Sequence, residues 1–325
     1  MKIKLFTFIL LSAIFLSSCA VLRNKMTTDT FKSISGTTTN LKYSPIYWQK
    51  DTLGQKVVEK AVFLVPVKIK GIDEQVLMQF DLGANRTMLY GNTLSALCKK
   101  YPELKKDTIH KENYMVFNNA EISISDNISL LADRLYVKND FGQSKIDTTQ
   151  IIIGSLGYDI MGDNVLILDF KSDKFAISES IPTELKSKAN YIPNADLNKF
   201  PIILPFKYGK KKVRLFYDTG SSMFPILTGT NRLKRVSKHR KIQEIDSISS
   251  WGKFIPVFKP LETKDKIGSL VIGNIDLGKV NIYGVKEMNN LKFLGRYLYG
   301  ITGNVIFDNK ILIISRKNNS FGIIE

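Results

Sequence analysis

The sequence predicts a mainly β protein with few short helices, built from two similar halves. From Ile46 onward the chain consists of short alternating apolar runs broken by Gly, Asn, Asp and Lys, a pattern typical of strands. A hairpin pattern that ends in Asp-x-Gly occurs twice, and a Gly-x-x-Gly pattern follows each copy. The length of 325 residues leaves room for two domains.

The N-terminus reads as an export signal. Lys2 and Lys4 precede an apolar stretch that is too short to span a membrane but suits a secretory signal. This stretch ends in Leu-Ser-Ser-Cys19, which resembles the lipobox of bacterial lipoproteins. The resemblance implies a signal peptide over 1–18 and acylation of Cys19; an ordinary signal followed by a buried cysteine is the alternative. Residues 19–45 are polar and rich in Thr and Ser, as expected for a tether.

The folded part contains an internal repeat. Residues 63–84 (FLVPVKIKGIDEQVLMQFDLGA) match residues 202–221 (IILPFKYGKKKVRLFYDTGS), and residues 154–177 match residues 300–323. Each match runs in the same order, so the sequence predicts a duplicated lobe. We expect an N-terminal lobe over 46–188 and a C-terminal lobe over 189–325. Helical patterns are limited to 92–100 and 232–245.

Two carboxylates occupy matching positions in this repeat. Asp81 and Asp218 each end an apolar strand, and Gly83 and Gly220 follow two residues later, where a tight loop needs them. If the two loops meet, the carboxyl groups share one proton, because like charges that close do not both ionise cheaply. One carboxylate then serves as general base on a water, and the other as acid. This chemistry needs no metal and no cofactor, and none is expected.

The second loop carries a family resemblance. The segment FYDTGSSMFPILTG (216–229) resembles the active-site loop of aspartic proteases of the pepsin and retroviral type, and residues 303–323 resemble the C-terminal stretch of pepsin-like enzymes. The resemblance covers about residues 60–325. It implies a bilobal pepsin-like fold with a pseudo-twofold repeat and the catalytic pair Asp81 and Asp218. The segments 152–154 and 298–300 match those that thread behind the two loops in the family.

The supporting residues match the family only in part. Both family loops usually read Asp-Thr-Gly, and each Thr hydroxyl holds the backbone of the opposite loop. Thr219 fits this role, whereas Leu82 has no hydroxyl. Ser221 can hydrogen-bond its own carboxylate; Ala84 cannot, although Ala occurs there in retroviral-type enzymes. The family also has a flap tyrosine over the cleft, and Tyr114 is the candidate by position.

The expected function is that of a lipid-anchored aspartic peptidase, acting on peptide or protein substrates in the bacterial cell envelope, facing the periplasm or the cell surface. The alternative is a catalytically impaired relative that binds peptides or acts as a scaffold, and a surface-coat or adhesion lipoprotein is a third hypothesis. The net charge is +17, but the basic run 232–241 has no interleaved aromatic residues for stacking bases, so no nucleic acid partner is expected. A monomer is expected. Two Cys and two His exclude a Cys/His zinc cluster and a dense disulfide scaffold.

Overall fold

The structure is a computed structural model that describes residues 30–36, 41–110, 115–125, 128–146, 150–237, 241–250, 253–261, 268–290, 292–293 and 296–325. Strands dominate, which confirms the prediction of a mainly β protein. No helix in these ranges is long and apolar enough to cross a membrane. The predicted signal peptide 1–18, the acylated Cys19, the flap residue Tyr114 and much of the tether lie outside the described residues.

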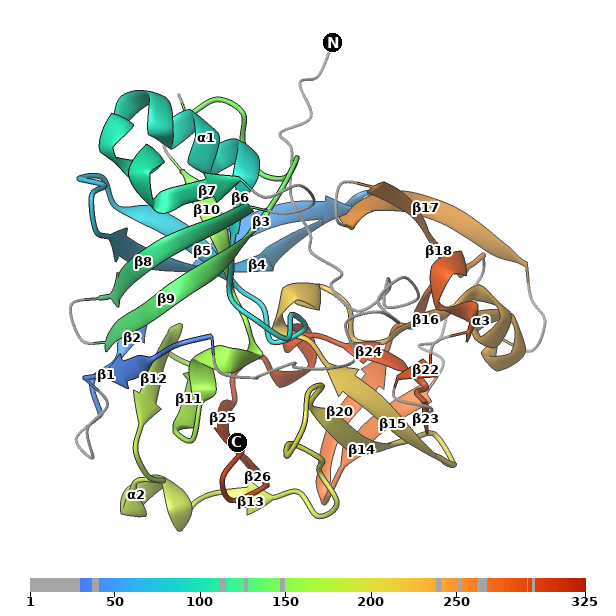
Figure 1. Ribbon diagram of the computed structural model, residues 1–325. Coiled ribbons are helices and arrows are strands. Elements are labelled where there is room, and N and C mark those ends of the chain that lie inside the picture. The colour runs from blue at the N-terminus through green and yellow to red at the C-terminus, as the bar shows by residue number, and fades with distance from the viewer. Residues whose placement is uncertain are drawn as a thin grey trace.

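The first half of the chain forms a nine-stranded sheet, at the upper left of Figure 1. Its strands are β1 (Ser33–Ser35), β3 (Tyr47–Leu53), β4 (Lys56–Ile69), β5 (Val76–Phe80), β6 (Met88–Tyr90), β7 (Thr108–His110), β8 (Met115–Ile124), β9 (Ile128–Lys138) and β10 (Ile152–Leu156).

The second half forms another nine-stranded sheet, at the right of Figure 1. Its strands are β14 (Ile203–Tyr208), β15 (Lys211–Tyr217), β16 (Leu227–Gly229), β17 (Ile242–Ser250), β18 (Lys253–Pro260), β19 (Gly268–Ile272), β20 (Ile275–Val280), β21 (Tyr283–Val285) and β24 (Gly300–Thr302). The short strands β22 (Lys292–Phe293) and β23 (Arg296–Tyr297) pair with each other.

A six-stranded sheet joins the two halves below them in Figure 1. It contains β2 (Ser44–Pro45), β11 (Val165–Asp169), β12 (Lys174–Ser178), β13 (Asn190–Tyr191), β25 (Ile311–Ser315) and β26 (Ser320–Ile324). At its centre β11 and β25 are antiparallel, with Ile167 opposite Ile313. Ile313 follows Gly300 by the same 13 residues as Ile167 follows Gly154. Matching positions of the repeat are therefore direct partners.

The helices are short. They are α1 (Gly91–Lys100), α2 (Thr183–Lys186), α3 (Thr230–Val236) and the 3-10 turns η2 (Pro102–Asp107), η3 (Tyr158–Met161), η4 (Thr219–Ser221), η5 (Lys286–Asn290) and η6 (Asn304–Phe307). The helix predicted over 92–100 is confirmed as α1. The prediction of a helix through 245 is wrong, because β17 begins at Ile242 and pairs with β18. Pairing with a neighbouring strand overrides the local helical pattern there.

Each half repeats one strand arrangement around its Gly-x-x-Gly segment. In the first half β5 and β10 are parallel, with Met78 opposite Gly154. In the second half β15 and β24 are parallel, with Leu215 opposite Gly300. A Cβ atom on Gly154 would lie 2.2 Å from the Met88 carbonyl oxygen, and one on Gly300 would lie 2.3 Å from that of Leu227. Both positions require glycine because a neighbouring strand lies against the backbone.

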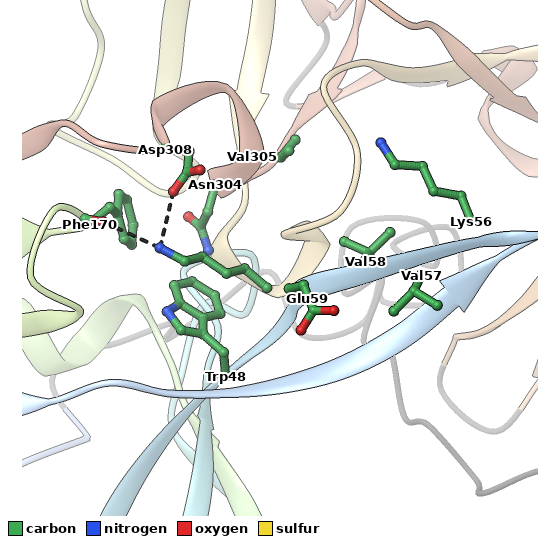
Figure 2. A pocket seen from close by; sticks show the side chains of 10 residues that line it. Trp48, Lys56, Val57, Val58, Glu59, Phe170, Asn304, Val305 and Asp308 are labelled. Atoms are coloured by element: carbon green, nitrogen blue, oxygen red, sulfur yellow. Dashed lines mark hydrogen bonds and ion pairs between the residues drawn. The ribbon is translucent and has the colours of Figure 1, made fainter.

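The hairpin of β3 and β4 extends from the first half onto the second. In Figure 1 it runs across the top toward β17, and the Gly54 amide donates a hydrogen bond of 2.8 Å to Asp246 Oδ2. At its base, Lys60 Nζ forms ion pairs with Asp173 (2.8 Å) and Asp308 (3.1 Å). A cavity of about 230 Å³ lies beside this junction, and Trp48 and Asp308 are among the residues that line it (Figure 2). The hairpin thus fastens the two halves together.

Candidate active site

The two aspartates hold equivalent places at the ends of their strands. Asp81 follows β5, and its amide donates to the Leu156 carbonyl at 2.8 Å. Asp218 follows β15, and its amide donates to the Thr302 carbonyl at 2.9 Å. In each half the residue before the second glycine of the Gly-x-x-Gly segment therefore fixes the backbone of the aspartate.

The loop after each aspartate turns back onto the carboxyl group. The Gly83 amide donates to Asp81 Oδ1 at 2.9 Å, and the Gly220 amide donates to Asp218 Oδ1 at 2.8 Å. The Ala84 amide also donates to Asp81 Oδ1, at 3.1 Å. These contacts hold the carboxyl planes in place and offer hydrogen bonds to the ionised form.

The two loops differ at the residue after each glycine. The Ser221 hydroxyl donates to Asp218 Oδ2 at 3.0 Å. Ala84 occupies the matching place beside Asp81 and has no hydroxyl to donate. The Asp218 carboxylate is therefore the better stabilised of the two as an anion.

Asp81 and Asp218 lie together, fully buried, and their carboxyl groups hydrogen-bond each other. Burial raises the pKa of Asp81 well above its usual range, and the neighbouring charge of Asp218 raises it further. Burial raises the pKa of Asp218 to about 6, while Ser221 and the other hydrogen bonds oppose this rise. The pair therefore retains one proton near neutral pH, on the Asp81 side.

Thr219 links the two loops. Its hydroxyl donates to the Phe80 carbonyl at 2.8 Å and accepts the Leu82 amide at 2.8 Å. Leu82 sits at the matching position of the first loop, fully buried in the main hydrophobic cluster. A leucine side chain has no hydrogen-bonding group, so this link runs in one direction only.

Two buried polar residues that the sequence analysis missed support the loops from behind. Asn304 of η6 donates to the Thr219 carbonyl (3.2 Å) and to Ser222 Oγ (2.7 Å). Asp159 of η3 accepts from the Thr87 amide at 2.8 Å and from the Thr87 hydroxyl at 2.7 Å. Each follows the second glycine of its Gly-x-x-Gly segment by one or two positions. This spacing from the second glycine is the feature of the sequence that marks both positions.

The structure thus brings together Asp81, Gly83 and Ala84 of the first loop with Thr219, Gly220 and Ser221 of the second. Within the described ranges, no group of three His, Cys, Asp or Glu residues is arranged to hold a metal ion. A scan against protein-family models finds no match, and a search of curated proteins finds none either.

Proposed function

We propose that this protein is an aspartic peptidase, in which Asp81 and Asp218 activate a water for attack on a peptide bond. The observation that carries the proposal is the buried, hydrogen-bonded pair of carboxyl groups on two matching loops. A buried pair that retains one proton supplies a base and an acid at the same place.

The chemistry follows from the unequal surroundings of the two groups. Asp218 accepts hydrogen bonds from Gly220 and Ser221, which favour its ionised form, so it takes a proton from the attacking water. Asp81 keeps its proton and donates it to the carbonyl oxygen as the tetrahedral intermediate forms. As that intermediate breaks down, Asp218 gives the proton that it took from the water to the leaving amine nitrogen, and Asp81 takes a proton back from a hydroxyl of the intermediate. The two groups exchange roles in each cycle.

The fold we propose is bilobal and pepsin-like, with a pseudo-twofold axis between the halves. Its support is the repeated pairing of Met78 with Gly154 and of Leu215 with Gly300. The direct pairing of Ile167 with Ile313 adds to this, because a twofold axis brings matching positions face to face.

We also propose that the protein is a monomer, anchored to the cell envelope by acylated Cys19. The support is the lipobox-like segment that ends at Cys19, because several acyl chains anchor a protein stably. The test is metabolic labelling with a fatty acid. Labelling is expected for the wild type and not for Cys19→Ser, and label that persists in this variant contradicts the anchor.

The second candidate function is a non-catalytic module that binds peptides. Two observations favour it: Leu82 replaces a hydroxyl residue, and neither carboxyl group is exposed, so substrate enters only after the surrounding segments move. Incubating the full chain with an unfolded protein from acid to neutral pH separates the two functions. Cleavage that Asp218→Asn abolishes supports the peptidase. Binding of a pepstatin-like inhibitor without any cleavage supports the module.

A further inference from the structure

A polar pair lies beside Asp81 on the first half. Gln79 stands two residues before Asp81, so both side chains leave the same face of the strand. On that sheet Gln79 is opposite Ser155 of β10. Leu77, on the same face, packs against a cluster that includes second-half residues, whereas Met78 and Phe80 point into the main core. Gln79 and Ser155 therefore face the region between the halves.

The second half has apolar residues at the matching place. Phe216 stands two residues before Asp218 and is opposite Ile301 of β24. Both side chains are buried in an apolar cluster. The strand arrangement thus accepts two apolar residues at this place, and the polar pair of the first half is not required by the fold.

The polar groups of the first half are buried without their usual partners. Gln79, Tyr90 and Ser155 are 2%, 2% and 0% exposed. Gln79 Nε2, the Tyr90 hydroxyl and Ser155 Oγ make no hydrogen bond of normal geometry to the part of the chain that the structure describes. Buried groups of this kind cost free energy unless water or a ligand satisfies them.

Tyr90 connects this cluster to the dyad. Its hydroxyl faces that of Ser155 outside normal hydrogen-bond geometry, and burial together with the charge of Asp81 raises the pKa of Tyr90 well above the usual range, against the smaller opposing effect of Ser155. The phenol therefore stays protonated and is available as a donor. Gln79 Nε2 is a second donor, so the cluster as a whole is suited to an oxygen acceptor.

A small cavity adjoins the cluster. It has a volume of about 10 Å³ and is lined by Gln79, Tyr90, Gly142, Gln143 and Ile152. This is roughly the space of one water. The wall is held firmly, because Gln143 Oε1 accepts the Ile152 amide at 2.8 Å and Gly142 lies so close to Tyr90 that a Cβ would be 2.6 Å from its Cβ.

We propose that Gln79, Tyr90 and Ser155 form a specificity recess, which receives only the terminal hydroxyl or carboxamide oxygen of a substrate side chain next to the scissile bond, in the place of the one water for which the recess has room. The inference rests on the proposed peptidase function. An aliphatic side chain placed there leaves the buried donors unpaired, and a site built to hydrogen-bond its ligand discriminates against such analogues. The matching wall at Phe216 and Ile301 offers no such donors.

The test measures how the full chain cleaves two series of peptides. One series has Ser, Thr or Asn beside the cleaved bond, the other has Leu or Phe there, and the peptides are otherwise identical. The wild type is expected to prefer the oxygen-bearing series. Gln79→Leu is expected to reduce kcat/KM for that series about tenfold, roughly the contribution of one hydrogen bond, and to leave the Leu series unchanged or faster. Gln75→Leu, the same change at an exposed position of β5's leading turn, is the matched control.

The outcomes separate this inference from the proposed function. The recess proposal is wrong if the wild type cleaves both series equally. It is also wrong if Gln79→Leu keeps its melting temperature and the ratio of kcat/KM between the two series does not change. In both cases the proposed peptidase function is unaffected. If the wild type cleaves nothing, the peptidase is wrong, and the recess is tested by thermal shift with the same peptides. Stronger stabilisation by the Asn peptide, lost in Gln79→Leu, then supports the recess. Equal stabilisation by the Asn and Leu peptides overturns it.

Discussion

Thr219 holds the backbone on both sides of Asp81, and Leu82 does not hold the backbone of the second loop in return. The Thr219 hydroxyl bonds the Phe80 carbonyl and the Leu82 amide, each at 2.8 Å. The position of the first carboxyl group thus depends on one side chain of the second half. Because the link is one-sided, a substitution of Thr219 tests how the position of Asp81 is held without changing either carboxyl group.

Thr219→Val removes the hydroxyl while keeping the shape of the side chain. It leaves a buried amide and a buried carbonyl unpaired, which is expected to lower the free energy of unfolding by about 2–4 kcal/mol. Peptide cleavage should fall as well, because Asp81 loses its fixed position. Chemical denaturation and cleavage rates check both effects. Ser247→Ala, at an exposed position on β17, should leave both nearly unchanged.

Leu82→Thr adds the hydroxyl that the first loop lacks. We expect activity to hold or rise, since the second loop gains a hydrogen bond. Stability is expected to fall by about 1–2 kcal/mol, because a fully buried leucine contributes more than one added hydrogen bond returns. A variant that is both more stable and less active would contradict this account of position 82.

Asp81→Asn and Asp218→Asn each remove half of the acid–base pair. Either change is expected to reduce the rate of peptide cleavage by about 10²–10⁴. The double variant should be nearly as active as the single ones, because groups that act as a unit are not additive. Asp133→Asn, at an exposed position, is the control. Cleavage that survives Asp218→Asn would eliminate the dyad.

The raised pKa values of the pair predict how stability depends on pH. Because folding raises the pKa of both carboxyl groups, the folded state binds protons more tightly than the unfolded state. The contribution of Asp218 to the free energy of unfolding is therefore largest below about pH 4 and is lost as pH rises through about 6, whereas the contribution of Asp81, whose pKa is raised well above its usual range, continues to fall at higher pH. Subtracting the denaturation profile of Asp218→Asn from that of the wild type reports the contribution of Asp218. A difference that grows toward neutral pH in favour of the wild type contradicts the assignment.

Gly303 allows η6 to pack behind the second loop. A Cβ atom there would lie 1.9 Å from the Ser221 carbonyl oxygen, so Gly303→Ala must displace backbone beside Asp218. We expect loss of activity and a lower melting temperature. Val305→Ala, two residues later at a partly exposed position, should have a small effect on both.

Local patterns predicted the strands, the loops and the meeting of the two aspartates, because the repeat places Asp81 and Asp218 after equivalent strands. They did not predict the end of α3, since the residues from Ile242 onward take their structure from pairing with β18. Nor did they predict the roles of Asp159 and Asn304, which depend on contacts with residues 72 and 85 positions away in sequence. The spacing from the second glycine of each Gly-x-x-Gly segment marks the two positions, but it does not tell which distant residues they contact.

The pairing of Ile167 with Ile313 has a consequence for how such a site evolves. In this chain β11 and β25 pair at matching positions of the repeat. Two identical chains related by a twofold axis also contact each other through matching positions. In a dimer of identical chains, one codon change alters both loops together. Within a single chain the halves mutate independently, so one loop carries Leu82 where the other carries Thr219. Gln79 and Ser155 likewise differ from Phe216 and Ile301 at the matching positions. Because the two loops are encoded separately, selection can act on each of them alone.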